Sequence, residues 1–277
     1  MNEREYKFGA NILENLTTGM YQDSKVIYRE YLQNSCDAID NAVKQGILRN
    51  KADGLIEIWL DFDARTIVIE DNGTGISVAD FQNTFGDIAD SDKRIGENKG
   101  FRGIGRLCGL AYCEEVVFST SAKGESTISI MRYDAKKMRG LLSENTKGNK
   151  KTANEVLQTI IKYETEKNKN IDSHFFKVEL IGISLENTDL LDEDEVRDYL
   201  SFVAPAPYQN KFVYREEIYK HANQIGFPLD EYTIKLEGKQ MFKGYSTRLK
   251  KSSGEAFDEI FDVYCKNFYD AHDNLIA

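Results

Sequence analysis

A carboxylate, a carboxamide and a second carboxylate lie close together between Arg29 and Ala38, as Glu30, Asn34 and Asp37. In a helix, which turns by about 100° per residue, Asn34 would lie about 40° round the axis from Glu30, and Asp37 about 20° the other way. The three side chains would form one polar stripe, whose oxygen atoms suit a metal ion and its phosphates. The solvated face of an ordinary helix gives the same spacing, so the assignment depends on other motifs.

A second motif follows a predicted strand, where Asp71 precedes Gly73, Gly75 and Ile76. An aspartate at this point can accept a hydrogen bond from an exocyclic amine. The glycines let a flat ring approach the backbone because they carry no Cβ. On its own, this D-x-G-x-G spacing is more typical of a tight turn after a strand.

The third motif is the glycine-rich loop from Gly100 to Gly105, which precedes a predicted helix beginning at Arg106. Backbone N–H groups at such a helix start can bind an anion such as phosphate. The loop is not a Walker loop, and it does not follow the first strand of a βαβ unit as a dinucleotide fingerprint would. A flexible linker is the alternative interpretation.

Apolar periodicity and turn residues predict the elements that must position these motifs. In chain order they are a helix over 25–43, strands over 56–60 and 67–69, a helix over 78–85, a helix from residue 106, and strands over 116–118, 127–131 and 177–181. The irregular segment 86–105 is typical of a functional or mobile loop. Residues 134–172, rich in Lys, Glu and Asn, are expected to form surface helices and a loop.

The segment from Ala204 to Tyr208 contains two of the three prolines and is the best candidate linker. Strands are predicted beyond it, over Tyr232–Leu236 and Phe261–Tyr264. Residues 205–277 are few for an independent domain, so we expect them to be the linker and the beginning of a further one.

Composition excludes several classes of protein. Hydrophobic residues make up 41% and charged residues 30% of the 277 residues, and no apolar run approaches the roughly 18 to 20 residues that span a bilayer. The N-terminus resembles no secretory signal, so we expect a cytoplasmic location. A net charge of −10 disfavours nucleic-acid binding. The four cysteines lack paired spacing, which favours reduced thiols.

In this order the three motifs resemble the gyrase, chaperone, histidine-kinase and mismatch-repair superfamily, the GHKL or Bergerat-fold ATPases. The resemblance covers about residues 10–200, and the first motif is most similar to that of heat shock protein 90-like chaperones. It implies a two-layer α/β sandwich, with a mixed, mainly antiparallel sheet covered by helices on one face, plus a smaller C-terminal α/β segment. Residues 1–204 would bind ATP and Mg²⁺ under a lid at about residues 86–105, and residues 205–277 would begin a middle-type domain.

The resemblance also implies a role for each matching residue. Glu30 would be the general base that activates the attacking water, and Asn34 would ligate Mg²⁺. Asp37 and Ala38 would line the adenine side, and Asp71 would accept the adenine amino group. The other implied nucleotide-binding residues are Gly73, Gly75 and Ile76 beside the base, Gly100, Phe101, Arg102, Gly103, Ile104 and Gly105 around the phosphates, and Ser91, Lys93 and Arg106 in or beside the lid.

Glu30 also separates functions within the superfamily, because histidine kinases generally have a non-acidic residue there. The histidines His174, His221 and His272 all follow the three motifs, and we expect them to be structural or on the surface. The implied function is slow ATP hydrolysis to ADP and phosphate, coupled to lid closure and to formation of a homodimer that acts on a protein client. The alternatives are a nucleotide-sensing module without hydrolysis and the ATPase part of a DNA repair or topoisomerase-type machine.

The chain departs from the chaperone pattern at two places. Chaperones commonly have a Gly-Thr pair before the late strand, with the threonine reaching the adenine-binding aspartate, whereas this chain has Phe175 and Phe176. Ser173 is the hydroxyl that could substitute. In the lid, Asp90 stands where chaperones often have lysine.

Overall fold

The computed structural model describes residues 9, 10, 13, 23–86, 105–145 and 151–244, and the backbone of residues 248–250 and 256–258. The strands are β1 (Leu55–Asp61), β2 (Thr66–Asp71), β3 (Glu115–Ser121), β4 (Thr127–Asp134), β5 (Ile161–Lys167), β6 (Phe175–Ile181), β7 (Thr233–Leu236), β8 (Lys239–Gln240), β9 (Arg248–Lys250) and β10 (Ala256–Asp258). The helices are α2 (Val26–Lys44), α3 (Val78–Gly86), α4 (Ala135–Asn145), α5 (Ala153–Ile160), α6 (Glu193–Val203) and α7 (Arg215–Gln224), with short 3₁₀ helices η2 (Lys51–Asp53), η3 (Gly105–Ala111) and η4 (Leu185–Leu191).

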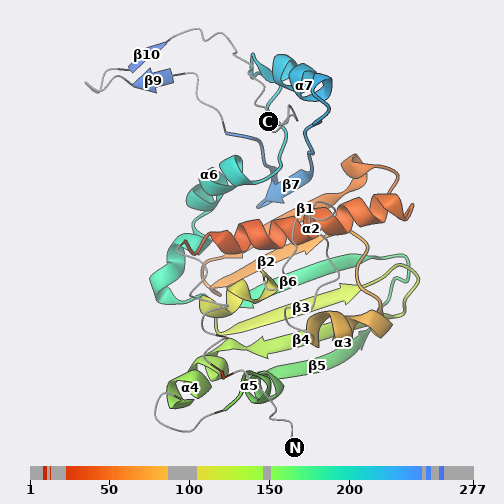
Figure 1. The fold of residues 1–277 in the computed structure, drawn as a ribbon, viewed down its shortest axis with the longest axis vertical. Coiled ribbons are helices and arrows are strands. Elements are labelled where there is room, and N and C mark those ends of the chain that lie inside the picture. The colour runs from red at the N-terminus through yellow and green to blue at the C-terminus, as the bar shows by residue number, and fades with distance from the viewer. Residues whose placement is uncertain are drawn as a thin grey trace, which may run out of the picture.

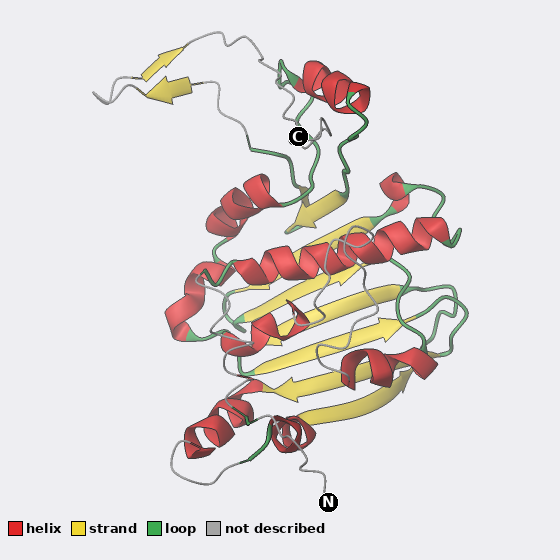
Figure 2. Cartoon of the chain, viewed as in Figure 1, coloured by secondary structure: helices red, strands yellow, loops and turns green. Residues whose placement is uncertain are grey.

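Eight of these strands form one open sheet of order β5-β4-β3-β6-β2-β1-β7-β8, and β9 and β10 form a separate pair (Figure 1). Neighbouring strands of the large sheet are antiparallel, except that β1 and β7 run parallel. Helices α2, α3 and η3 lie across one face of the sheet (Figure 2). The predicted two-layer α/β sandwich with a mixed, mainly antiparallel sheet is therefore confirmed.

Helix α2 covers the centre of the sheet with a continuous apolar face. Ile27, Tyr31 and Ile39 are each at most 2% exposed, and their spacing follows the 3.6-residue period of a helix. Beneath them, β1 and β2 bury alternate residues, as strands with one buried face do. The buried apolar face therefore fixes how α2 is rotated against the sheet, and with it the direction of the polar stripe.

The prediction for residues 134–172 was partly wrong. Helices α4 and α5 form as expected, but Ile161–Lys167 is not a surface loop: it pairs with β4 as the edge strand β5. Its side chains alternate between β-branched or aromatic residues and charged ones, and most are exposed. The charges that suggested a loop are typical of an edge strand, where they discourage pairing with another chain.

Most of the predicted lid, residues 87–104, lies outside the described residues, as does the strand predicted over Phe261–Tyr264. The helix predicted from Arg106 is present as the 3₁₀ helix η3. Among the described residues, no helix combines the length and the apolar character needed to cross a membrane.

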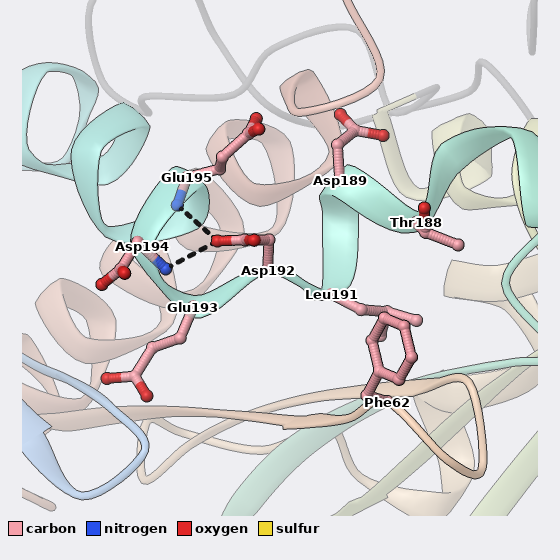
Figure 3. Close-up of a pocket in the computed structure, with 8 residues that line it drawn as sticks. All are labelled: Phe62, Thr188, Asp189, Leu191, Asp192, Glu193, Asp194 and Glu195. Carbon is pink, nitrogen blue, oxygen red and sulfur yellow. Dashed lines mark hydrogen bonds between the residues drawn. The ribbon is translucent and has the colours of Figure 1, made fainter.

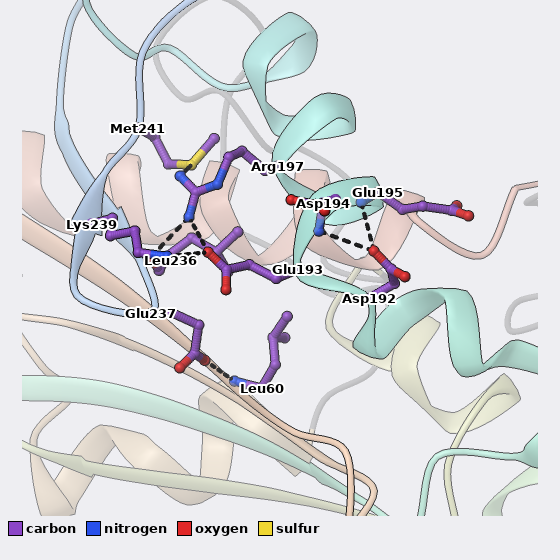
Figure 4. Close-up of polar contacts among 10 residues, drawn as sticks. All are labelled: Leu60, Asp192, Glu193, Asp194, Glu195, Arg197, Leu236, Glu237, Lys239 and Met241. Carbon is purple, nitrogen blue, oxygen red and sulfur yellow. Dashed lines mark hydrogen bonds and ion pairs between the residues drawn. The ribbon is translucent and has the colours of Figure 1, made fainter.

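Strand β7 joins the C-terminal segment to the sheet. Before it, residues 205–209 have no regular secondary structure, and the Tyr232 hydroxyl donates to Asp40 Oδ1 on α2 at 2.7 Å. Figure 4 shows two further links: Arg197 of α6 bonds Glu193 at 2.7 Å and the Leu236 carbonyl at 3.3 Å, while Glu237 accepts from the Leu60 amide at 2.5 Å. The domain boundary at residue 204 stays a prediction.

Candidate functional site

One face of α2 contacts two of the three motifs at once. A Cβ added to Gly105 would lie 2.4 Å from Glu30 Oε2, and one added to Gly73 would lie 2.6 Å from the Ala38 Cβ. The Thr74 amide also donates to the Ala38 carbonyl at 3.3 Å. Eight residues of helix separate Glu30 from Ala38, a distance of about 12 Å at 1.5 Å per residue. The glycine-rich loop therefore ends at one end of this helix face, and the Asp71 loop lies at the other.

Glu30 is held at the Gly105 end of this helix face by its neighbour. Arg29 Nη2 lies 2.9 Å from Glu30 Oε1, and the Glu30 side chain is 18% exposed. Further along the helix, Asn34 is partly buried and Asp37 is buried, between the two contact points. A partly exposed carboxylate of this kind can accept a proton from a water molecule.

Asp71 is fully enclosed at the other end, and only one of its carboxylate oxygens is hydrogen-bonded. Oδ1 accepts from the Gly73 amide at 2.9 Å, whereas Oδ2 is buried and accepts no hydrogen bond within the described part of the chain. Burial raises the pKa of Asp71 to about 7, although the Gly73 amide and the nearby Ser35 hydroxyl favour its charged form. A buried acceptor without a donor is rare in a folded protein and suits an exocyclic amine.

The loop after Asp71 fits only glycine at residue 75. Gly75 has φ +63°, and a Cβ there would lie 2.0 Å from the Ser121 carbonyl oxygen. The next residues are bonded to β3 and its turn: the Ile76 amide donates to Thr120 Oγ1 at 3.0 Å, and the Val78 amide to Glu125 Oε1 at 3.0 Å. The backbone beside Asp71 is therefore fixed by the neighbouring strand.

The structure adds a residue to this site that the sequence did not single out. His174 Nδ1 lies 2.7 Å from the Gly73 carbonyl oxygen, so this histidine contacts the loop beside Asp71. A lone histidine between Ser173 and Phe175 gives no signal of such a contact. The one available clue was its position directly before Phe175 and Phe176, where the chain departs from the chaperone pattern.

The position where chaperones commonly carry threonine is filled by an aromatic ring. Phe176 is the register partner of Asp71 between β2 and β6, and its ring stacks on those of Phe85 and Phe118. Ser173 does not supply the missing hydroxyl, because its Oγ bonds Asn168 and the Asn170 carbonyl. Ser35 of α2 is the hydroxyl near Asp71 instead.

Arg106 and Tyr31 join the start of η3 to its surroundings. Tyr31 of α2 donates from its hydroxyl to the Arg106 carbonyl at 3.0 Å and accepts from the Gly109 amide at 3.3 Å. The Arg106 guanidinium donates to the Thr84 carbonyl and lies 5.1 Å from the centre of the Phe85 ring. Arg106 thus contacts the end of α3 in this structure. Ser91, Lys93 and Gly100–Ile104 lie outside the described residues, so their roles stay predictions.

Metal binding by protein groups alone has no support in the described part of the chain, where no cluster of three or more His, Cys, Asp or Glu side chains could hold an ion. Mg²⁺ in nucleotide sites typically takes one or two protein oxygens and completes its shell with phosphate and water. The Asn34 carbonyl oxygen fits that limited role. The described cysteines Cys36, Cys108 and Cys113 are buried, and none of them forms a disulfide within the described part of the chain.

A separate acidic pocket of about 540 Å³ lies at the start of α6 (Figure 3). Asp192 caps this helix by accepting from the amides of Asp194 and Glu195, both at 3.0 Å. Lys25, just before α2, pairs with Asp189 at 3.0 Å and with Glu195 at 2.9 Å, and these carboxylates raise its pKa. The pocket's charges therefore connect α6 to the beginning of the helix that carries Glu30.

Comparison with known proteins gives the same assignment as the geometry. A family model described as histidine kinase-, DNA gyrase B- and HSP90-like ATPase matches residues 21–174, which is more than half of the chain. The chain belongs to this family. The matched region of this HSP90-like ATPase domain contains Glu30, Asp71 and Gly105, and its last residue is His174.

Curated relatives place the domain nearer to one branch of the family. It is 27% identical to the chaperone protein HtpG of Halalkalibacterium halodurans over 143 residues, 46% of this chain and 23% of the relative. The HtpG of Chlorobium phaeobacteroides is 36% identical over 96 residues, 32% and 15% of the two chains. That of Coxiella burnetii is 31% identical over 132 residues, 41% and 20%. The matched segment thus spans less than a quarter of these relatives, and the chain is a diverged, HSP90-like ATP-binding domain.

Proposed function

We propose that this chain binds ATP with Mg²⁺ and hydrolyses it slowly to ADP and phosphate, with lid closure and dimerisation coupled to nucleotide binding. One observation carries the proposal: a single face of α2 contacts the loop of the unsatisfied acceptor Asp71 at one end and brings Glu30 against Gly105 at the other. This arrangement offers a nucleobase acceptor and a carboxylate base at opposite ends of one site. Membership of the ATPase family supports the same function.

At the base end, Asp71 Oδ2 would accept the adenine amino group. Ala38 and Gly73 pack together beside it, Asp37 lines the helix side, and Gly75 and Ile76 shape the adjacent loop. Amide or hydroxyl acceptors left unpaired in a buried site cost free energy, so a ligand that donates to Oδ2 gains affinity. The selectivity for adenine would follow from this one acceptor, which pairs with an amino group and not with a carbonyl.

At the phosphate end, Glu30 would orient and deprotonate the attacking water, and Asn34 would supply an oxygen ligand to Mg²⁺. When bound, the metal would offset the negative charge of the phosphates. Gly105 approaches the Glu30 carboxylate so closely that a side chain there would displace it. The amides of residues 100–105, with Ser91, Lys93 and Arg106, would surround the phosphates from the lid over residues 86–105.

We further propose that residues 1–204 form the nucleotide-binding domain and that residues 205–277 begin a middle-type domain. The similarity to the chaperone protein HtpG supports dimerisation on ATP binding and action on a protein client. Strand β7 pairs with β1, so the second segment extends the sheet of the first. This pairing supports a mechanical connection between the nucleotide site and the second segment.

The test uses the full chain with Mg²⁺-ATP, and measures nucleotide binding by calorimetry, phosphate release and mass by light scattering. Glu30→Ala should lower the rate of phosphate release at least about 100-fold, because general-base catalysis contributes about that much, while leaving ADP affinity within a few-fold. Asp71→Asn should abolish binding. Glu186→Ala, at an exposed carboxylate in η4, is the matched control and should change neither.

The outcomes separate the proposal from its alternatives. Turnover that survives Glu30→Ala would remove Glu30 as the base, and normal affinity in Asp71→Asn would defeat the pocket. Tight binding with no phosphate release in the parent chain would indicate a nucleotide-sensing module. Turnover that rises on adding DNA would instead indicate a DNA repair or topoisomerase-type ATPase.

A further inference from the structure

The starting observation is that Gly73 is bonded at both of its backbone polar groups. Its N–H donates to Asp71 Oδ1 at 2.9 Å. Its carbonyl oxygen lies 2.7 Å from His174 Nδ1, and since a carbonyl can only accept, Nδ1 carries the hydrogen and donates. A Cβ at Gly73 would lie 2.6 Å from the Ala38 Cβ, so the residue is also wedged against α2.

The loop that carries His174 is itself firmly anchored. The two hydrogens on Nδ2 of the buried Asn168 are shared among three acceptors, Ser121 Oγ at 3.0 Å, the Glu125 carbonyl at 3.2 Å and Ser173 Oγ at 3.1 Å. The Gly124 amide donates to the Ile171 carbonyl at 2.7 Å. The loop between β5 and β6 is therefore packed on the turn between β3 and β4, and it presents the imidazole to Gly73 from a fixed place.

We infer that His174 is a positioning residue for nucleobase recognition: its bond to the Gly73 carbonyl restrains the backbone dihedral angles of Gly73, and the Gly73 N–H, held in place by that restraint, limits the rotation of the Asp71 carboxylate. The bond to Oδ1 leaves Oδ2 as the acceptor for an exocyclic amine. His174 touches neither the base nor the phosphates in this scheme, and acts only through Gly73. The inference rests on the proposed nucleotide-binding function and adds a residue to its adenine end.

The chemistry predicts selectivity as well as affinity. A purine with an amino group at ring position 6 can donate to Asp71 Oδ2. A purine with a carbonyl at that position cannot, because its oxygen and Oδ2 both accept hydrogen bonds. A site with a fixed carboxylate should therefore prefer ADP over inosine diphosphate, because the wrong partner leaves buried polar groups unpaired. If the carboxylate rotates freely, ADP loses its advantage while inosine diphosphate changes little.

The experiment measures the dissociation constants of ADP and inosine diphosphate for the full chain and for three variants. His174→Leu removes the donor and should weaken ADP about tenfold, the usual effect of one hydrogen bond, with less than about a twofold change for inosine diphosphate. His174→Asn places an amide N–H near the position of Nδ1 and should restore most of the ADP affinity. His221→Leu in α7 is the matched control and should change neither constant.

Three results would overturn the inference, provided that thermal melting shows folded variants. ADP affinity that is unchanged in His174→Leu would exclude any role, and an equal loss for both nucleotides would indicate a merely structural one. No rescue by His174→Asn would show that the Nδ1 donor is not what matters. A parent chain that binds neither nucleotide would instead refute the proposed function, and this inference with it.

Discussion

At the scale of single residues, Asp71 links burial to binding. Its pKa is raised from the ordinary 3.8 to about 7 because the charged carboxylate is buried. The unliganded site therefore holds a proton at slightly acidic pH. An amine that donates to Oδ2 favours the charged form and lowers this pKa, so binding should expel the proton.

We predict that Mg²⁺-ADP, whose phosphates are already ionised, releases part of a proton from the chain on binding at a pH just below 7. The measurement is calorimetry in two buffers with different heats of ionisation, where the apparent binding enthalpy should differ by the proton count times the difference in those heats. Glu30→Ala should show the same release because it leaves the adenine end intact. An enthalpy that is independent of buffer would mean that Asp71 keeps its charge state on binding.

A second residue-scale prediction concerns the tight approach at Gly75. Gly75→Ala should destabilise the chain by about 2 to 4 kcal/mol, since a left-handed backbone and a clash with the Ser121 carbonyl both oppose the new methyl group. Gly124→Ala is the matched control: Gly124 has φ +90° with no atom within 4 Å of an added Cβ, so only the backbone term of about 1 kcal/mol applies. Urea unfolding measures the free energy of unfolding of both variants. Equal losses would show that Gly75 makes no close contact with the Ser121 carbonyl.

At the scale of elements, the site depends on how α2 and η3 are joined. The Tyr31 hydroxyl bonds two backbone groups of η3, one as donor and one as acceptor. Tyr31→Phe should therefore cost about 1 to 3 kcal/mol of unfolding free energy and lower turnover, because Gly105 begins the same 3₁₀ helix and lies against Glu30. Tyr208→Phe removes the hydroxyl of a half-buried residue that stacks on Phe212 and belongs to neither element, and it serves as the control. Tyr31→Phe with the parent's stability and turnover would contradict this role of the hydroxyl.

Elements were predictable where burial left a pattern. The apolar spacing of α2 and the alternation in β1 and β2 follow directly from one face being buried, and both were predicted within a few residues. Strand β5 was missed because an edge strand buries little, so its charged residues resembled those of a loop. The alternation of apolar and polar residues reveals a strand only where one of its faces is buried, and an edge strand such as β5 buries few side chains.

At the scale of the whole molecule, the C-terminal segment contributes to the sheet beyond the predicted domain boundary. Tyr232, only 2% exposed, packs into the core, and β7 pairs with the edge of β1. A fragment of residues 1–204 should retain nucleotide binding. Its free energy of unfolding should be at least about 3 kcal/mol lower than that of the full chain, because it loses a buried aromatic residue and a strand. A fragment of residues 1–244 keeps β7 and β8 and is the control. Equal unfolding midpoints for the two fragments would show that the pairing of β7 with β1 adds nothing to the stability of residues 1–204.

The sequence by itself determined the fold class, the family and the order of the three motifs, because each depends on local spacing: oxygens along one helix face, glycines after a strand, and glycines ahead of a helix. Tertiary structure decided what those residues touch. It placed Ser35 rather than Ser173 near Asp71, filled the usual threonine position with Phe176, and brought His174 to the Gly73 carbonyl from the entry to β6. Such contacts join residues 36 to 105 positions apart in the sequence, and they arise from strand order, register and helix packing, which no local pattern in the sequence records.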